Sequence, residues 1–158
     1  MYHSKPLTKD TWKDFEDLFQ KHQGVRGGCW CTYHQLPSSE YDRLSREDRK
    51  DYHRKRVEEG FATGLILYED ETPIGWCQFG RGDIFEQLNR NRAYQKLDKD
   101  NQATADWRIT CIFVDKDHRR KGLSSIILSK TTEMIRDWGG GMVEAFPKPC
   151  ITKMKLRS

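Results

Sequence analysis

The sequence contains no long hydrophobic run. Its longest apolar stretches lie near residues 64–68 and 109–114, and both are far shorter than the roughly 20 residues that a membrane-spanning helix needs. The first ten residues, MYHSKPLTKD, also lack the apolar centre of a signal peptide. We therefore predict a cytoplasmic protein that makes no membrane contact.

The cysteines show no regular spacing that would indicate pairs. The five cysteines are an odd number without a repeating interval, which predicts reduced thiols in place of a disulfide framework. Cys29, Cys31 and His34 are candidate zinc ligands, but the Cys-x-Cys spacing is shorter than usual and no second ligand pair follows. We expect no metal, and buried thiols beside aromatic residues are the plainer interpretation.

A large excess of one charge is also missing. Lys and Arg number 28 against 24 Asp and Glu, a formal net charge of +4, which is too small and too dispersed to indicate nucleic-acid binding. It would suit a small polyanionic ligand. The expected helix over residues 46–59 is basic, but interspersed acids favour a solvated, self-paired face. A nucleic-acid or protein interaction domain that uses this helix stays as an alternative, and its binding would depend strongly on salt.

The residues that are present predict one folded domain over residues 1–158. The chain is 33% charged and 35% hydrophobic, and its aromatic content of 11% is too high for a disordered polyelectrolyte. Helical periodicity predicts a first helix that follows Thr8 and closes before Gly24, a second over residues 46–59 and a third over residues 122–138. Strands are predicted over residues 63–68, 74–79, 107–114 and 142–146, the first two as a hairpin with a loop of about five residues. Residues 24–39 are expected to form a structured loop, and residues 82–105 a polar excursion with a helical turn or two.

Residues 114–125, VDKDHRRKGLSS, connect the expected central strand to the third helix. A strand, a short turn and a long helix point the helix N-terminus beyond the strand end, where free N–H groups and the helix dipole form an anion site. Gly122 would let the backbone approach a ligand, and the small Ser124 would not block it. The side chains of Arg119, Arg120 and Lys121 add positive charge where phosphates would lie.

These residues carry a resemblance to a known family. Residues 119–124, RRKGLS, resemble the Arg/Gln-x-x-Gly-x-Gly/Ala pyrophosphate loop of the GNAT acetyltransferase superfamily, and residues 112–118 resemble the strand before it. The order of expected elements over residues 5–146 is similar to the family order. Ser124 replaces the usual Gly or Ala, and Lys116 stands where many members have Pro. The resemblance implies an α/β fold with a mixed, mostly antiparallel central sheet, flanking helices, and a parallel, splayed strand pair at the cofactor site.

The resemblance also implies acetyl-CoA as the co-substrate, bound between strands 107–114 and 142–146. The strand backbone would pair with the pantetheine amides, and loop N–H groups would hold the pyrophosphate. The cofactor-binding residues predicted in this way are Ile112, Phe113, Val114, Arg119, Arg120, Lys121, Gly122, Leu123, Ser124 and Ser125.

The implied reaction moves an acetyl group from acetyl-CoA to a primary amine of a small molecule or a peptide. Bases in the family are often carboxylates on or near the fourth strand, and Asp106 is the only acid at that place, so we predict Asp106 as the general base. The loop between the first two helices borders the acceptor pocket in such proteins. The predicted acceptor-binding residues are therefore Trp30, Tyr33 and His34.

The family fold normally continues past the fifth strand with a helix and two more strands, and only residues 147–158 remain here. Twelve residues are too few for three elements, so we expect a weak strand or a disordered tail and a fold that is incomplete after about residue 146. This would leave strand 142–146 as an exposed edge that a homodimer could complete, and no Tyr could be assigned as general acid. A non-catalytic acetyl-CoA-binding or regulatory module is therefore the main alternative to an enzyme, and a truncated reading frame would explain the short end equally well.

Overall fold

The structure is a computed structural model that describes residues 1–85, 105–145 and 152–156. The helices in these ranges are α1 (Trp12–Lys21), α2 (Ser38–Arg43), α3 (Arg46–Glu58), the short 3-10 helix η3 (Lys116–His118) and α5 (Leu123–Asp137). The strands are β1 (Tyr2–Pro6), β2 (Gly64–Glu69), β3 (Thr72–Arg81), β4 (Trp107–Val114), β5 (Gly141–Ala145) and β6 (Thr152–Leu156). In these ranges no helix combines the length and the apolar character that crossing a membrane requires.

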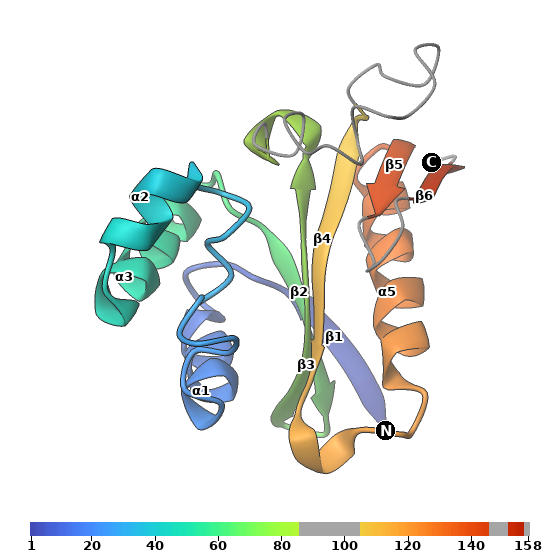
Figure 1. Ribbon diagram of the computed structural model, residues 1–158. Coiled ribbons are helices and arrows are strands. Elements are labelled where there is room, and N and C mark those ends of the chain that lie inside the picture. Colours follow the sequence, from blue (N-terminus) through green and yellow to red (C-terminus); the bar gives the residue numbers. More distant parts are fainter. Residues whose placement is uncertain (86–104, 146–151, 157–158) are drawn as a thin grey trace.

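The strands form one sheet in the order β1-β2-β3-β4-β5-β6. Every neighbouring pair is antiparallel except β4 and β5, which run parallel. Helices α1, α2 and α3 lie on one side of the sheet and α5 lies on the other (Figure 1). The predicted fold class, a mostly antiparallel sheet with one parallel pair and flanking helices, is confirmed.

Each face of the sheet carries its own hydrophobic core. On the α1 side, Trp12, Phe15 and Phe19 of α1 pack against Trp76 of β3. On the α5 side, the buried stripe of α5 covers the aliphatic side chains of β2, β3 and β4. The helical spacing of apolar residues in the sequence therefore corresponds to two real contact faces.

Strands β4 and β5 pair over only part of their length. The paired residues are Trp107 with Val143, Arg108 with Glu144 and Ile109 with Ala145, so the described part of β5 leaves the second half of β4 unpaired on that side. A bulge lies at the same place, because Phe79 of β3 faces Ile109 and the preceding Gln78 faces Cys111, which leaves Thr110 as the extra residue. The described part of β5 therefore pairs with β4 only before the bulge, and the splay of the two strands stays a prediction.

A buried ion pair joins the two parallel strands. The side chains of Arg108 and Glu144 are both 0% exposed, and Arg108 Nε donates to Glu144 Oε2 at 3.1 Å. The Arg108 Nη1 group also donates to the carbonyl oxygens of Gly82 at 3.2 Å and Phe85 at 2.8 Å. Arg108 therefore ties β4, β5 and the segment after β3 together within the paired part of the two parallel strands.

Three elements differ from the sequence predictions. Strand β1 was not predicted, because its five residues are mostly polar and it acquires strand geometry by pairing with β2. Helix α2 lies at the end of the expected loop and has no buried residue, so it gives no periodic signal. The turn between β2 and β3 is also shorter than expected, with the strands ending at Glu69 and starting again at Thr72.

The chain after β5 needs a larger correction. Strand β6 pairs antiparallel with all of β5, from Gly141 opposite Leu156 to Ala145 opposite Thr152. The weak strand expected in residues 147–158 is therefore real, and β5 is not the exposed edge that was predicted. In the described part of the chain the sheet therefore ends at β6 on this side, and the homodimer stays a prediction. The polar excursion predicted for residues 82–105 lies largely outside the described residues.

Candidate functional site

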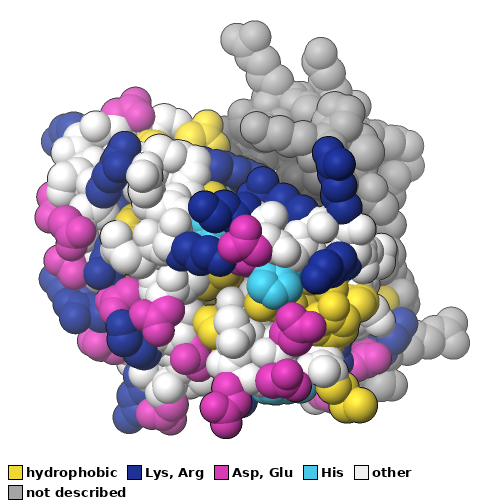
Figure 2. Space-filling view, turned by 90° about the horizontal axis from the view of Figure 1, so that it is seen from below, with side chains coloured by type: hydrophobic (Ala, Val, Ile, Leu, Met, Phe, Trp, Pro, Cys, Tyr) yellow, Lys and Arg dark blue, Asp and Glu magenta, His cyan; other side chains and the backbone are white. Residues whose placement is uncertain are grey.

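A cavity of about 720 Å³ opens where β4 ends and α5 begins. Nine of the ten predicted cofactor-binding residues line it, the exception being Lys121. Figure 2 views this end of the molecule and shows Lys and Arg side chains gathered near the middle of the face. The sequence motif and the unpaired end of β4 therefore meet at one place.

Gly122 shapes the floor of this cavity. It precedes α5 with a left-handed φ of 73°, and a Cβ atom added there would meet nothing within 4 Å. No acidic residue lies in the first turn of α5, and no side chain caps its N-terminus. The first-turn N–H groups are thus open to an anion, and the helix dipole favours one.

Arg119 is held in place beside the cavity. Its Nε donates to the carbonyl oxygen of Val114 at 3.1 Å, and its guanidinium lies 5.7 Å from the centre of the Phe113 ring. The next residue, Arg120, has a left-handed φ of 66° and lines the same cavity. Two positive side chains therefore flank the helix N-terminus, one of them fixed by a backbone hydrogen bond.

Four further cavity residues were missed at the sequence level. His22, Val25 and Arg26 come from the end of α1 and the turn after it, and His118 comes from η3. His22, Val25 and Arg26 are far in sequence from residues 112–125, so no pattern connected them, whereas His118 lies inside that segment and was not singled out as a binding residue. The only available signal was a lone Arg in the glycine-rich stretch GVRGG, and that signal is weak by itself.

Asp115 connects α1 to the cavity loop. Its buried carboxylate lies 2.7 Å from Lys21 Nζ and 2.8 Å from His118 Nδ1, and it accepts the N–H of Asp117 at 3.1 Å. Burial raises the pKa of Asp115, but the hydrogen bonds from Lys21, His118 and the Asp117 N–H outweigh it and lower the pKa to about 2. The end of α1 is thereby fixed against the turn that precedes Gly122.

Replacing Asp115 with Asn should lower the free energy of unfolding by about 2 kcal/mol at pH 7. The folded pKa lies below the ordinary value, so this stabilisation is present above about pH 4 and is lost as the pH falls towards 2. Urea unfolding across this range should show wild type and variant converging. Asp117→Asn is the matched control, since its side chain is 63% exposed and such pairs contribute little. Curves for Asp115→Asn and wild type that stay equally far apart from pH 7 to pH 2 would contradict this assignment.

Asp106 lies at the start of β4, at the other end of the strand from the cavity, and is exposed. Its Oδ2 accepts the N–H of Met142 at 2.9 Å, and its backbone carbonyl accepts the N–H of Gly82. This geometry favours a structural role where β4 and β5 begin side by side. The general-base assignment stays a prediction.

The three predicted acceptor-binding residues do not line the cavity. Trp30 is 2% exposed and packs against Phe15 and Phe19, so it supports the loop from within the core. Tyr33 is 54% exposed and makes edge contacts with the rings of His34 and Tyr41. Tyr33 and His34 thus lie on the outer side of the loop, away from the cavity lining, and their role in acceptor binding stays a prediction. In the described ranges, no three His, Cys, Asp or Glu side chains gather in a way that could hold a metal ion.

Comparison with solved structures identifies the fold. A GCN5-related N-acetyltransferase from Ralstonia eutropha is similar with a TM-score of 0.55 at 12% identity, over 94% of this chain and 85% of that chain. An acetyltransferase from Thermus thermophilus gives 0.53 at 13% identity, over 92% and 75%. An aminoglycoside acetyltransferase from an uncultured soil metagenomic sample, in complex with sisomicin, gives 0.54 at 10% identity, over 94% and 78%.

At the level of sequence, no curated protein matches the chain significantly. The profile of the acetyltransferase (GNAT) family, however, matches residues 13–148. That match covers most of the chain and includes α1 from residue 13 onward, strands β4 and β5, and the cavity loop. With the fold and the loop geometry in agreement, the chain belongs to the acetyltransferase (GNAT) family.

Proposed function

We propose that this protein transfers an acetyl group from acetyl-CoA to a primary amine, and that acetyl-CoA binds in the cavity at the end of β4. One observation carries the proposal: the unpaired end of β4, the left-handed Gly122 and the open N-terminus of α5 line one cavity. Backbone amides and helix N–H groups are what an elongated ligand with amides at one end and phosphates at the other would require.

The residues fit such a ligand in size and charge. A cavity of about 720 Å³ lies in the range of small-molecule sites, roughly 300–1,000 Å³. Arg26, Arg119 and Arg120 place positive charge around it, and the described part of β5 leaves the β4 backbone at residues 112–114 free to pair with amides. Bound acetyl-CoA would supply the thioester, while this chain binds the phosphates, orients the pantetheine and excludes water beneath α1.

The acceptor is proposed as an amine on a small molecule or a peptide. The fold relatives include the aminoglycoside acetyltransferase described above and a ribosomal-protein-alanine N-acetyltransferase from Brucella melitensis, the latter with a TM-score of 0.50 at 12% identity. Both kinds of acceptor present an amine. In the transfer, the amine nitrogen bonds to the acetyl carbon, the carbon–sulfur bond breaks, and a base takes the amine proton.

Gly122→Glu should weaken acetyl-CoA binding at least about 100-fold, since it places a carboxylate against the site expected to hold the phosphates. Gly60→Glu is the matched control. Its φ is 80° against 73° at Gly122, and neither glycine has an atom within 4 Å of an added Cβ. The two variants therefore carry similar backbone strain, and only one adds charge to the cavity. Calorimetric titration of both with acetyl-CoA gives the answer, and equal affinities for Gly122→Glu and wild type would overturn the site.

Asp106→Asn separates the structural role from the general-base role. Asparagine can still accept the Met142 N–H, so we expect kcat within about twofold of wild type and an unchanged pH profile. A loss of kcat of about 100-fold at unchanged acetyl-CoA affinity would restore Asp106 as the base. Stopped assays of thiol release between pH 6 and pH 9 measure both quantities.

A non-catalytic acetyl-CoA-binding module is the second candidate. It predicts the same titration result for Gly122→Glu but no amine-dependent release of CoA thiol. A panel of polyamines, aminoglycosides, amino acids and peptides separates the two functions. Acetyl-CoA binding without thiol release for any amine would favour the module.

A further inference from the structure

Cys31 belongs to a loop, but it is buried against one face of the sheet. Trp76 Nε1 donates to Cys31 Sγ at 3.0 Å, and Gln78 Nε2 donates to the Cys31 carbonyl oxygen at 2.7 Å. Trp76 and Gln78 are two residues apart on β3 and therefore point to the same face. These two hydrogen bonds fix the loop against the strand beside β4.

Cys111 lies next to this anchor on β4. It is the register partner of Gln78, so its side chain points to the same face of the sheet, and it packs against the core that contains Cys31. Both thiols therefore belong to the same packed cluster on the α1 side of the sheet, and each perturbs the pKa of the other. The fold therefore brings together two thiols that lie far apart in the sequence.

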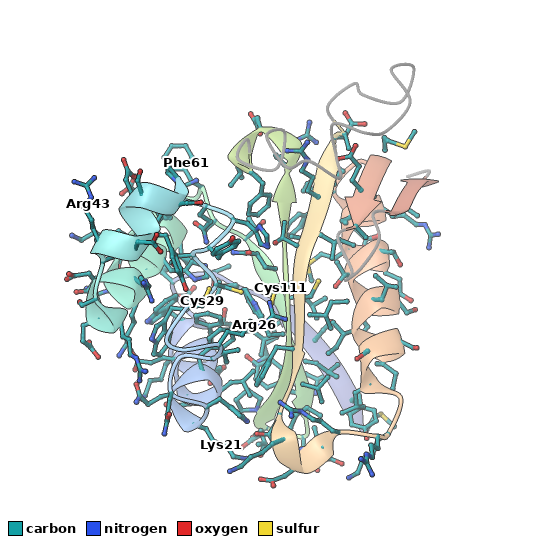
Figure 3. The ribbon with its side chains drawn as sticks, viewed as in Figure 1. Lys21, Arg26, Cys29, Arg43, Phe61 and Cys111 are labelled. Atoms are coloured by element: carbon teal, nitrogen blue, oxygen red, sulfur yellow. The ribbon has the colours of Figure 1, made fainter. Side chains whose placement is uncertain are left out.

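The two thiols differ in exposure and in charge. Cys111 is partly exposed and Cys31 is buried. The hydrogen bond from Cys31 lowers the pKa of Cys111 against the opposing effect of burial, and the positive charge of Arg26 lowers it further. Burial, together with the hydrogen bond to Cys111, raises the pKa of Cys31 well above its ordinary value. Figure 3 shows Arg26 and Cys111 between α1 and the sheet.

We propose that Cys31 and Cys111 form a reversible disulfide when hydrogen peroxide oxidises the protein. The Cys111 thiolate attacks one peroxide oxygen, the O–O bond breaks, and the released hydroxide takes a proton to become water. The Cys31 sulfur then attacks the sulfur of the Cys111 sulfenic acid, and water leaves with the Cys31 proton. Two thiols are oxidised and one peroxide is reduced to two waters, whether or not acetyl-CoA binds.

The other described cysteines are poorer partners. Cys77 is buried in the core on the α5 side of the sheet, whereas Cys31 and Cys111 both pack on the α1 side. Cys29 is buried and perturbs the pKa of Tyr41 on α2, whereas the donors from β3 described above contact Cys31. The anchored Cys31 is thus the resolving thiol that the geometry favours.

Peptide mapping of the peroxide-treated full chain tests the proposal. After blocking with N-ethylmaleimide, trypsin should release residues 27–43, which contain Cys29 and Cys31, linked to residues 109–116, which contain Cys111. Dithiothreitol should separate the two peptides. Cys150 lies outside the described residues, and its tryptic peptide has a different mass, so a link to it would be recognised and would contradict the proposal.

Variants assign the link within the first peptide. Cys29→Ser should form the linked peptide at the wild-type rate, and Cys31→Ser should abolish it and leave a Cys111 sulfenic acid that dimedone traps. Cys111→Ser should form no link. Retention of the link in Cys31→Ser, or full alkylation of both thiols in the folded protein after peroxide, would overturn the proposal. A thermal melt of each variant shows whether it is folded.

Arg26→Gln should slow the reaction of Cys111 with peroxide several-fold, because the neighbouring positive charge is lost. Arg43→Gln is the matched control, since Arg43 lies on α2 away from Cys111 (Figure 3). The link should also raise the melting temperature by about 5–10 °C, because it closes a long loop of the unfolded chain. A peroxide rate for Arg26→Gln equal to that of Arg43→Gln would remove Arg26 from the proposal, and an unchanged melting temperature on oxidation would contradict the disulfide.

Discussion

Arg108→Met should lower the free energy of unfolding by about 3–5 kcal/mol. The variant leaves the Glu144 carboxylate buried without this cation, and it removes the donor to the carbonyl oxygens of Gly82 and Phe85. A buried charge that loses its partner costs more than the pair itself contributes. Urea unfolding monitored by tryptophan fluorescence measures the loss.

The double variant Arg108→Met/Glu144→Leu is the control. It removes both charges together, so we expect it to recover at least half of the stability lost by Arg108→Met. A loss equal to the sum of the two single variants would show that the pair is not coupled.

Acidification should destabilise the protein through His53. The ring is 0% exposed, its Nδ1 lies 2.8 Å from the Trp30 carbonyl oxygen, and its Nε2 has no hydrogen-bond partner in the part of the chain that the structure describes. Burial, opposed by that hydrogen bond and reinforced by Arg56, lowers the pKa of His53 to about 4. The unfolded chain therefore takes up a proton near pH 6.5, where the folded chain does not. The contribution of His53 to stability is fully present above about pH 6.5, and about 3 kcal/mol is lost as the pH falls to 4.

His53→Gln tests this directly. Its amide can still donate to the Trp30 carbonyl oxygen, so the variant should be less stable at pH 7 but should lack this acid-dependent loss. His3→Gln is the matched control, because His3 is exposed on β1, and it should keep the wild-type pH dependence. Parallel pH profiles for His53→Gln and wild type between pH 7 and 4 would disprove the role of His53.

Local patterns in the sequence predicted most of the fold. Residues 107–114 are rich in β-branched and aromatic side chains, as a central strand is, and the predicted strand coincides with β4. The run of cations before Gly122 also predicted the helix N-terminus that the structure places at the cavity. Both signals are local, because they depend on residues that are neighbours in the chain.

The parts that failed depend on distant partners. β1 and β6 exist because β2 and β5 offer unpaired backbone groups, and nothing in their own residues demands a strand. Arg26 reaches the cavity only because α1 packs on β3 and ends beside β4. The contact of Asp106 with the backbone N–H of Met142 also joins residues that are distant in sequence, and its role as general base stays a prediction.

The bulge at Thr110 changes which way the rest of β4 faces. Ile109 and Ile112 both belong to the core under α5, although an odd number of positions separates them, while Cys111 and Phe113 pack on the α1 side. A regular strand would alternate without this change of phase. One inserted residue thus determines which side chains in the second half of β4 point towards α1. Among them are Cys111, which packs against the core that contains Cys31, and Phe113, whose ring lies under the Arg119 guanidinium.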